Sequence, residues 1–193
     1  MNAIAVFCGS SPGNDSVFEE TAVELGQLLA REKIKLVYGG AKVGLMGTVA
    51  NAALEEGGEV VGVLPHFLSS KEIAHEALTE LILVDSMHDR KLKMHDLCQG
   101  VIALPGGYGT LEEVFEFITW GQLGLHSKPT GVFNVNGFYD SLLTFLDETV
   151  QKGFLKRSNR EMLLDSISCQ DLLQQMKDYK PPQIAKWISK DEV

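Results

Sequence analysis

Short apolar runs alternate along the chain with longer amphipathic stretches. The run Ile102 to Leu104 is apolar at every position, as in a parallel sheet that helices cover on both faces. Strands are predicted over residues 3–8, 35–38, 59–64, 81–84, 101–104 and 130–134, and helices over residues 16–32, 47–56, 87–97, 111–123, 139–152 and 170–179. This alternation predicts an α/β fold, in which a doubly wound, Rossmann-like parallel sheet forms a three-layer αβα sandwich.

Residues 1–180 are expected to form a single domain, and residues 181–193 a C-terminal tail. Ser16 and Glu19 have the spacing of a capping box at the start of the first helix. Residues 68–78 are compatible with either a helix or a loop beside the sheet edge. In the tail, Ile184, Trp187 and Ile188 have helical spacing, which favours a short helix packed on its own domain over a contact with another subunit.

Composition narrows the class of protein. The chain has 193 residues, of which 45% are hydrophobic, and a formal net charge of −9. These values exclude disordered and fibrous proteins and argue against binding to nucleic acid or to an anionic membrane through the overall field. No apolar run approaches the roughly 20 residues of a membrane span. Three separate cysteines and the lack of a signal-peptide pattern at the start lead us to expect a reducing cytoplasm.

Three glycine-rich turns follow predicted strands. They comprise Gly9 to Gly13, Gly39 and Gly40 with Gly44 and Gly47, and Pro105 to Thr110. In this sheet type, ligands bind at the carboxyl ends of the strands, where helix N-termini attract anions. One such turn could be a plain connection, but three at one edge favour a ligand that carries phosphate.

Several familiar motifs are missing. The second turn lacks the Gly-Lys-Ser/Thr ending of a P-loop, and Glu112 stands where a dinucleotide fingerprint would have its third glycine. The histidines and cysteines lack metal-ligand spacing, and no Gly-x-Ser-x-Gly elbow is present. We therefore expect no metal site, no ATP hydrolysis of the P-loop kind, no bound NAD or FAD and no serine nucleophile.

Acidic residues gather just after the third turn. Thr110 and Glu113 have the spacing of a capping box, which would account for both without any function. A capping box leaves the three preceding glycines and the further acid Glu116 unexplained. Such an acidic cluster needs a cation, and Arg90 and Lys91, early in the predicted helix 87–97, are the best candidates.

Taken together, these blocks resemble the LOG family of cytokinin riboside 5′-monophosphate phosphoribohydrolases. The resemblance covers roughly residues 1–180 and rests on Val-Tyr-Gly-Gly, Gly-Leu-Met-Gly, Met-His-Asp-Arg-Lys and Pro-Gly-Gly-Tyr-Gly-Thr-Leu-Glu-Glu. It implies hydrolysis of the N-glycosidic bond of an N6-modified AMP, or of AMP, to the free base and ribose 5-phosphate. It also implies that no cofactor is needed and that the enzyme is a homodimer.

The resemblance also implies roles for individual residues. Arg90 and Glu113 would be the catalytic pair. The substrate would be bound by Glu72, Lys91, Gly106, Gly107, Tyr108, Gly109, Thr110, Leu111, Glu112 and Thr119. Asp89 replaces the more usual Glu before Arg90, which could alter how Arg90 is held.

Physical chemistry agrees with the expected catalytic pair. Cleavage of a ribosyl C–N bond passes through an oxocarbenium-like state with positive charge on the sugar. A carboxylate such as Glu113 would stabilise that charge or orient the attacking water. Arg90 would orient Glu113 or contact the nucleotide. Two alternatives stay open, a nucleotide-binding module without chemistry and a pyridoxal-phosphate-dependent decarboxylase, for which only Lys42 and Lys91 lie near the predicted edge.

Overall fold

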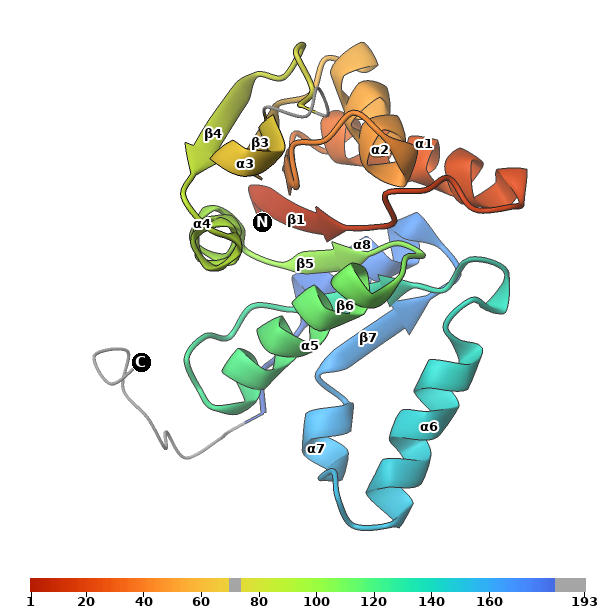
Figure 1. The fold of residues 1–193 in the computed structure, drawn as a ribbon. Helices are drawn as coiled ribbons and strands as arrows, with labels where there is room; N and C mark the ends of the chain where they lie inside the picture. Colours follow the sequence, from red (N-terminus) through yellow and green to blue (C-terminus); the bar gives the residue numbers. More distant parts are fainter. Residues whose placement is uncertain (70–73, 183–193) are drawn as a thin grey trace.

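A seven-stranded parallel sheet forms the centre of the computed structural model, which describes residues 1–69 and 74–182 (Figure 1). The strands are β1 (Ala3–Phe7), β2 (Lys35–Tyr38), β3 (Val60–Pro65), β4 (Glu80–Val84), β5 (Val101–Ala103), β6 (Thr130–Phe133) and β7 (Leu163–Ser166). The helices are α1 (Ser16–Arg31), α2 (Gly44–Glu55), α3 (His66–Ser69), α4 (Met87–Leu97), α5 (Tyr108–Gln122), α6 (Asp140–Gln151), α7 (Arg157–Arg160) and α8 (Cys169–Asp178), with a 3₁₀ turn η1 (Val135–Gly137). The doubly wound α/β prediction is confirmed.

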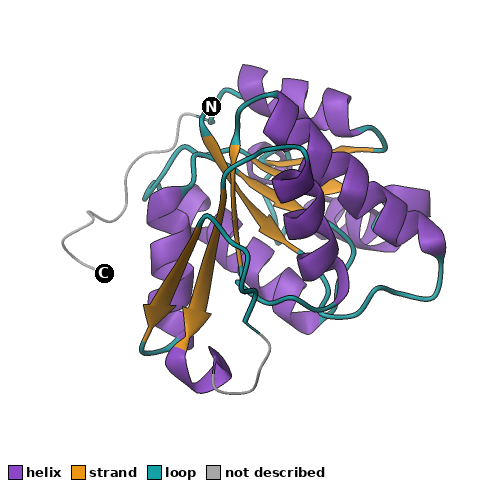
Figure 2. Cartoon of the chain, turned by 90° about the horizontal axis from the view of Figure 1, so that it is seen from above, coloured by secondary structure: helices purple, strands orange, loops and turns teal. Residues whose placement is uncertain are grey.

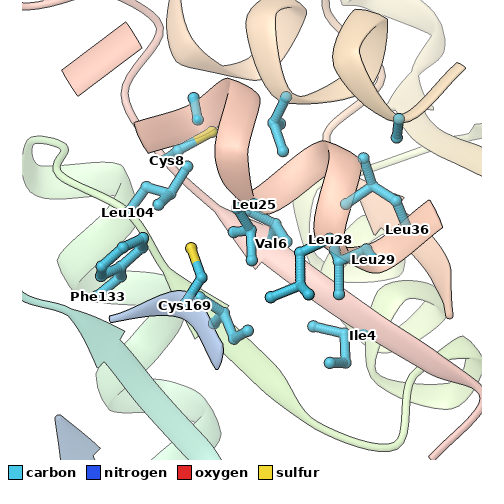
Figure 3. Packing of buried hydrophobic residues seen from close by; sticks show 14 of the residues in the cluster. Ile4, Val6, Cys8, Leu25, Leu28, Leu29, Leu36, Leu104, Phe133 and Cys169 are labelled. Atoms are coloured by element: carbon cyan, nitrogen blue, oxygen red, sulfur yellow. The ribbon is translucent and has the colours of Figure 1, made fainter. Parts of the chain in front are cut away.

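Alternate residues of the strands feed two separate cores. Ile4 and Val6 of β1 pack with α1, α2 and α8, whereas Ala5 and Phe7 of the same strand pack with α4, α5 and α6. Figure 2 shows helices on both sides of the strands, and Figure 3 shows the first core, where Leu25 and Leu29 of α1 lie over β1. Every residue of β1 is therefore buried, as the apolar pattern predicts.

The strand order is β4-β3-β2-β1-β5-β6-β7. The chain builds outward from β1 to β4 and then returns to place β5 on the other side of β1, with Phe7 paired to Ala103. Connections that leave β1 and β5 in opposite directions open a crevice at the carboxyl ends of these two strands. The glycine-rich turns that begin at Gly9 and at Pro105 border this crevice.

Six of the seven strands lie where the apolar pattern predicts them. The seventh, β7, was missed because it is a short edge strand that contains Asp165 and Ser166, so it lacks an apolar run. The stretch 68–78 contains the end of α3 and then, at Ala74, an isolated antiparallel bridge to Ala41. Residues 70–73 lie outside the described residues.

Two predicted capping boxes are wrong. Asp15 is the N-cap of α1: its backbone is extended and its carboxylate accepts a hydrogen bond from the Val17 N–H at 3.1 Å, so Ser16 is already inside the helix. Helix α5 begins at Tyr108 instead of residue 111, with Gly107 as its N-cap. Thr110 therefore lies within the first turn of α5 and does not cap it.

The C-terminal tail cannot be compared in full with its prediction. Ile184, Trp187 and Ile188 lie outside the described residues, which end at Pro182. Within the described parts of the chain, no helix has the length and apolar character needed to cross a membrane.

Candidate active site

A cleft of about 300 Å³ opens at the carboxyl ends of β1 and β5. Its walls come from the first turn (Gly9 and Ser10), the start of α4 and the start of α5. The lining residues are Val6, Phe7, Cys8, Gly9, Ser10, Gly39, Met46, Met87, Arg90, Gly107, Tyr108, Gly109, Thr110, Glu112 and Glu113. This position is the switch point at which ligands bind in open parallel sheets.

The N-terminus of α5 faces the cleft without a side-chain cap. Gly107, the N-cap, has no side chain to accept from the first backbone N–H groups of the helix. Those N–H groups have no partner within the helix, and the helix dipole adds partial positive charge at this end. The start of α5 is therefore suited to hold an anion such as a phosphate.

The glycines of the third turn differ in what they do. A Cβ on Gly106 would lie 2.1 Å from the Thr110 Oγ1, so close packing explains this glycine. A Cβ on Gly107 or Gly109 would meet nothing within 4 Å, and neither residue has a positive φ. Packing and backbone conformation leave these two glycines unexplained, whereas access of a ligand to the backbone explains both.

The glycines of the second turn are mostly structural. Gly40 and Gly44 have φ values of +75° and +56°, which side chains rarely adopt. A Cβ on Gly44 would also lie 2.3 Å from the Ser10 carbonyl carbon, and one on Gly47 would lie 2.3 Å from the Lys42 carbonyl oxygen. Gly44 thus lets the second turn pack against the first, while Gly40 and Gly47 are explained by backbone conformation and by packing within the turn.

Arg90 and Glu113 approach each other across the cleft. Arg90 lies in the first turn of α4, and Glu113 follows the first turn of α5. The Arg90 Nη2 is 3.8 Å from the Glu113 Oε1, and both side chains are nearly buried, with 12% and 11% of their surfaces exposed. The structure thus brings together the two residues predicted to be catalytic.

Burial changes the acidity of Glu113. Loss of hydration raises the pKa of this carboxyl from 4.5 to about 7, with Glu112 and Glu116 adding to the rise and Arg90 and Lys91 opposing it. A carboxyl with a pKa near 7 exchanges protons at neutral pH. Such a group is suited to acid or base catalysis.

Lys91 connects α4 to the acidic cluster of α5. Its Nζ lies 2.6 Å from the Glu112 Oε1 and 2.9 Å from the Glu116 Oε2. Burial opposes the charge on this ammonium group, but the two carboxylates outweigh burial and raise the pKa of Lys91. Lys91 therefore stays protonated, and its single positive charge offsets part of the negative charge of Glu112 and Glu116 beside Glu113.

Asp89 stabilises the turn that carries Arg90 and Lys91. The backbone N–H of Asp89 donates to the Ser86 Oγ at 3.1 Å, and the Ser86 hydroxyl donates to the Asp89 carboxylate at 2.6 Å. Ser86 is the N-cap of α4, and Asp89 pairs with its hydroxyl, whereas the acid of a capping box would accept from the backbone N–H of the N-cap residue. Asp89 thus stabilises the start of α4, the turn in which Arg90 lies.

Other predicted substrate residues lie in different settings. Tyr108 borders the cleft with 94% of its surface exposed. Leu111 packs against the core on the α4–α6 face, and Thr119 is exposed, its hydroxyl donating to the Phe115 carbonyl at 2.7 Å. Neither Leu111 nor Thr119 lines the cleft, and Glu72 lies outside the described residues.

Several side chains to which the motifs gave no role also line the cleft. They include Cys8 at the end of the first apolar run, Met46 and Met87. Burial, reinforced by the nearby Glu113, raises the pKa of the Cys8 thiol, so this cysteine stays protonated and is a poor nucleophile. The sequence placed Cys8, Met46 and Met87 at the end of a strand or near a helix start. It did not indicate a role for them, because their side chains form no recognisable catalytic or binding motif.

A second, more apolar pocket adjoins the cleft. It has a volume of about 320 Å³ and shares Gly9, Ser10 and Gly107 with the cleft. Phe18 and Phe138 form its far wall, with their rings in an edge-to-face arrangement at 5.9 Å. Within the described ranges, no group of three or more His, Cys, Asp or Glu side chains is arranged to hold a metal ion.

A family model and individual relatives both assign this chain to the same protein family. Residues 46–176 match the family described as possible lysine decarboxylase. The chain is 47% identical over 178 residues to cytokinin riboside 5′-monophosphate phosphoribohydrolase LOG2 of Arabidopsis thaliana. That alignment covers 92% of this chain and 84% of LOG2. It is also 49% identical over 179 residues to the probable cytokinin riboside 5′-monophosphate phosphoribohydrolase LOGL5 of Oryza sativa subsp. japonica. That alignment covers 93% of this chain and 73% of LOGL5.

Solved structures share the fold at lower identity. The molybdenum cofactor binding protein from the phototrophic bacterium Rippkaea orientalis has a TM-score of 0.70 and 22% identity, over 92% of this chain and 96% of that one. The fold therefore extends beyond the close relatives, whereas the sequence similarity to LOG2 and LOGL5 runs through both the Arg90 and the Glu113 segments. From this identity and coverage, the chain belongs to the LOG family of cytokinin riboside 5′-monophosphate phosphoribohydrolases.

Proposed function

We propose that the protein hydrolyses the N-glycosidic bond of an N6-modified AMP, or of AMP itself, to the free base and ribose 5-phosphate. The observation that carries this proposal is the placement of Glu113 beside an uncapped helix N-terminus. Glu113 is the fifth residue after Tyr108, which corresponds to roughly 7.5 Å along the helix axis. A phosphate at the N-terminus of α5 and a sugar C1′ at Glu113 fit this spacing.

The reaction needs charge stabilisation at the sugar. The C1′–N9 bond breaks, a water oxygen bonds to C1′, and the base leaves with the proton that the water gives up. The sugar is positively charged in the transition state, and the ionised Glu113 carboxylate stabilises that charge and orients the water. Binding of the remote phosphate holds the sugar in place for this step.

Arg90 and Lys91 support the carboxylate in different ways. The Arg90 guanidinium lies at the edge of the cleft, 3.8 Å from Glu113, which is too far for a hydrogen bond but close enough to favour the ionised acid. Because Arg90 also lines the cleft, we propose that its guanidinium either orients Glu113 or contacts the nucleotide. Lys91 acts through Glu112 and Glu116, which it binds directly.

The decarboxylase alternative finds no support in the two lysines near the sheet edge. A pyridoxal phosphate enzyme needs a lysine amine that is free to form a Schiff base. Lys91 is a protonated ammonium group held by two carboxylates. Lys42 is half-exposed, does not line the cleft and lies 4.0 Å from Glu76, so neither lysine fits this cofactor.

Incubation with AMP and with isopentenyl-AMP, followed by chromatography of the products, tests the proposed reaction. Release of adenine or isopentenyladenine together with ribose 5-phosphate is expected. Tight binding of both nucleotides without release of a base would refute the hydrolase and favour the binding module. The ratio of kcat/KM for the two substrates gives the preference for an N6 substituent.

We also infer that the enzyme is a homodimer in the cytoplasm. The family resemblance supports the dimer, and the three free, buried cysteines agree with a reducing compartment. Light scattering on the purified chain tests the oligomeric state, and cell fractionation tests the location.

A further inference from the structure

The guanidinium of Arg90 occupies the space where Gly39 would carry a side chain. An ideal Cβ on Gly39 would lie 2.0 Å from the Arg90 Nη2 and 3.1 Å from its Cζ. Gly39 follows directly after β2, so the end of this strand forms the floor under the guanidinium. Any residue with a Cβ at this position would displace the Arg90 head group.

Backbone conformation does not require this glycine. Its neighbour Gly40 has a φ of +75°, whereas Gly39 is outside the left-handed region. The other close neighbour of a Cβ on Gly39 is the Met46 Sδ at 3.3 Å, the end of a flexible side chain. Room for Arg90 is therefore the main demand that the structure makes on this position.

Arg90 is held by the shape of its surroundings more than by hydrogen bonds. Among the described residues, its buried Nε has no hydrogen-bond partner. Its Nη1 donates to the weak acceptor Met87 Sδ at 3.9 Å, and its Nη2 lies 3.8 Å from the Glu113 Oε1. A head group with such loose polar contacts moves when the surface beneath it changes.

We propose that Gly39 is a positioning residue for Arg90, and that its missing side chain sets the place of the guanidinium opposite Glu113. This inference rests on the proposed function, in which Arg90 and Glu113 act together. Gly39 itself contributes no chemistry to the reaction. Its effect on turnover passes entirely through Arg90.

A double-mutant cycle tests this dependence. Gly39→Ala is expected to lower kcat on the order of 10²-fold, the effect of misplacing a catalytic group by about 1 Å. In an Arg90→Ala background, the same Gly39→Ala change should lower kcat no further, because the group that it displaces is gone. An unchanged kcat in the single variant, or an equal loss in both backgrounds, would overturn the proposal.

Gly131→Ala is the matched control for a general packing effect. This glycine lies in β6, away from the cleft, and its Cβ would lie 2.7 Å from the Leu172 Cδ1, again the end of a flexible side chain. Gly131→Ala should change the melting temperature and leave kcat unaltered. Gly39→Ala is expected to lower kcat and leave the melting temperature unaltered. A loss of kcat in proportion to a loss of stability in Gly39→Ala would count against the positioning role of Gly39.

A second readout requires no turnover. The carboxyl carbon of Glu113 can be titrated by NMR in protein labelled with ¹³C-glutamate. Displacement of Arg90 removes a charge that lowers the pKa of Glu113, while Lys91, Glu112 and Glu116 stay in place. Gly39→Ala should therefore raise the titration midpoint, whereas no shift would overturn the proposal. If the wild-type chain releases no base, the proposed function fails and this titration still decides the role of Gly39.

Discussion

The Arg90 Nη2 lies 3.8 Å from the Glu113 Oε1, and the two side chains come from the starts of different helices. The separation exceeds hydrogen-bond distance, so Arg90 stabilises the Glu113 charge without engaging both carboxylate oxygens. Glu113 keeps an oxygen available for the sugar or for water. This arrangement combines an ionisable acid with a permanently charged cation.

Glu113→Gln should abolish most of the turnover and preserve binding. The amide has the shape of the acid but no negative charge, so stabilisation of the sugar cation is lost and kcat should fall on the order of 10²–10³-fold. The Kd for AMP, measured by calorimetry, should change little because the phosphate is held at the N-terminus of α5. Unchanged turnover in this variant would refute the catalytic role of Glu113.

The value of kcat/KM should rise with pH through about 7. The reaction uses the ionised form of Glu113, and burial raises the pKa of this carboxyl to about 7, so the acid is largely protonated and inactive at lower pH. Glu112→Gln serves as the control. It removes a charge that raises the pKa of Glu113, so the midpoint should move to lower pH. A midpoint that belongs to the substrate phosphate would not move.

Glu113→Gln should also stabilise the folded protein at neutral pH. The pKa of Glu113 is about 7 in the folded state against 4.5 for a free side chain, so the native state holds a proton that the unfolded state releases. This group therefore costs stability as the pH rises from about 4.5 to 7. The variant should melt at a higher temperature than the wild type at pH 8 and at the same temperature at pH 4. An equal difference at both pH values would point to packing instead.

Gly109→Ala should separate stability from ligand binding. Gly109 lies in the first turn of α5, where a Cβ meets no other atom, so alanine should stabilise the helix by up to about 1 kcal/mol. The same methyl group projects toward the open N-terminus, so KM for AMP should rise.

Gly57→Ala is the matched control for that prediction. A Cβ on Gly57 also meets no atom, but the φ of +79° should make alanine destabilising by about 1–2 kcal/mol. It lies after α2, away from the cleft, so KM should not change. A KM for Gly109→Ala equal to that of the wild type would place the phosphate elsewhere.

Much of the fold could be predicted from apolar runs, since buried parallel strands such as β1 and β5 are apolar at every position. The pattern failed at β7, where an edge strand needs only one buried face. It also misplaced the start of α5 by three residues, because Gly107 and Gly109 look like loop residues although Gly109 is helical.

The candidate site was predictable in part for a different reason. Charged residues and glycines in fixed motifs reveal where Arg90 and Glu113 lie in the chain. They do not reveal contacts between segments, so coordinates were needed to show that Arg90 lies over Gly39 and that Lys91 forms ion pairs with Glu112 and Glu116. Leu111 is part of the motif, yet its side chain faces the core. A motif thus identifies a segment more reliably than the direction of each of its side chains.

The pairing of β1 with β5 has a consequence for biosynthesis. The two halves of the crevice are far apart in the chain and meet only when Phe7 and Ala103 become neighbours. A nascent polypeptide that has emerged only as far as β4 cannot yet retain nucleotide, however well its first strands have condensed. Ligand capture during translation would therefore report the moment at which the second half of the sheet docks.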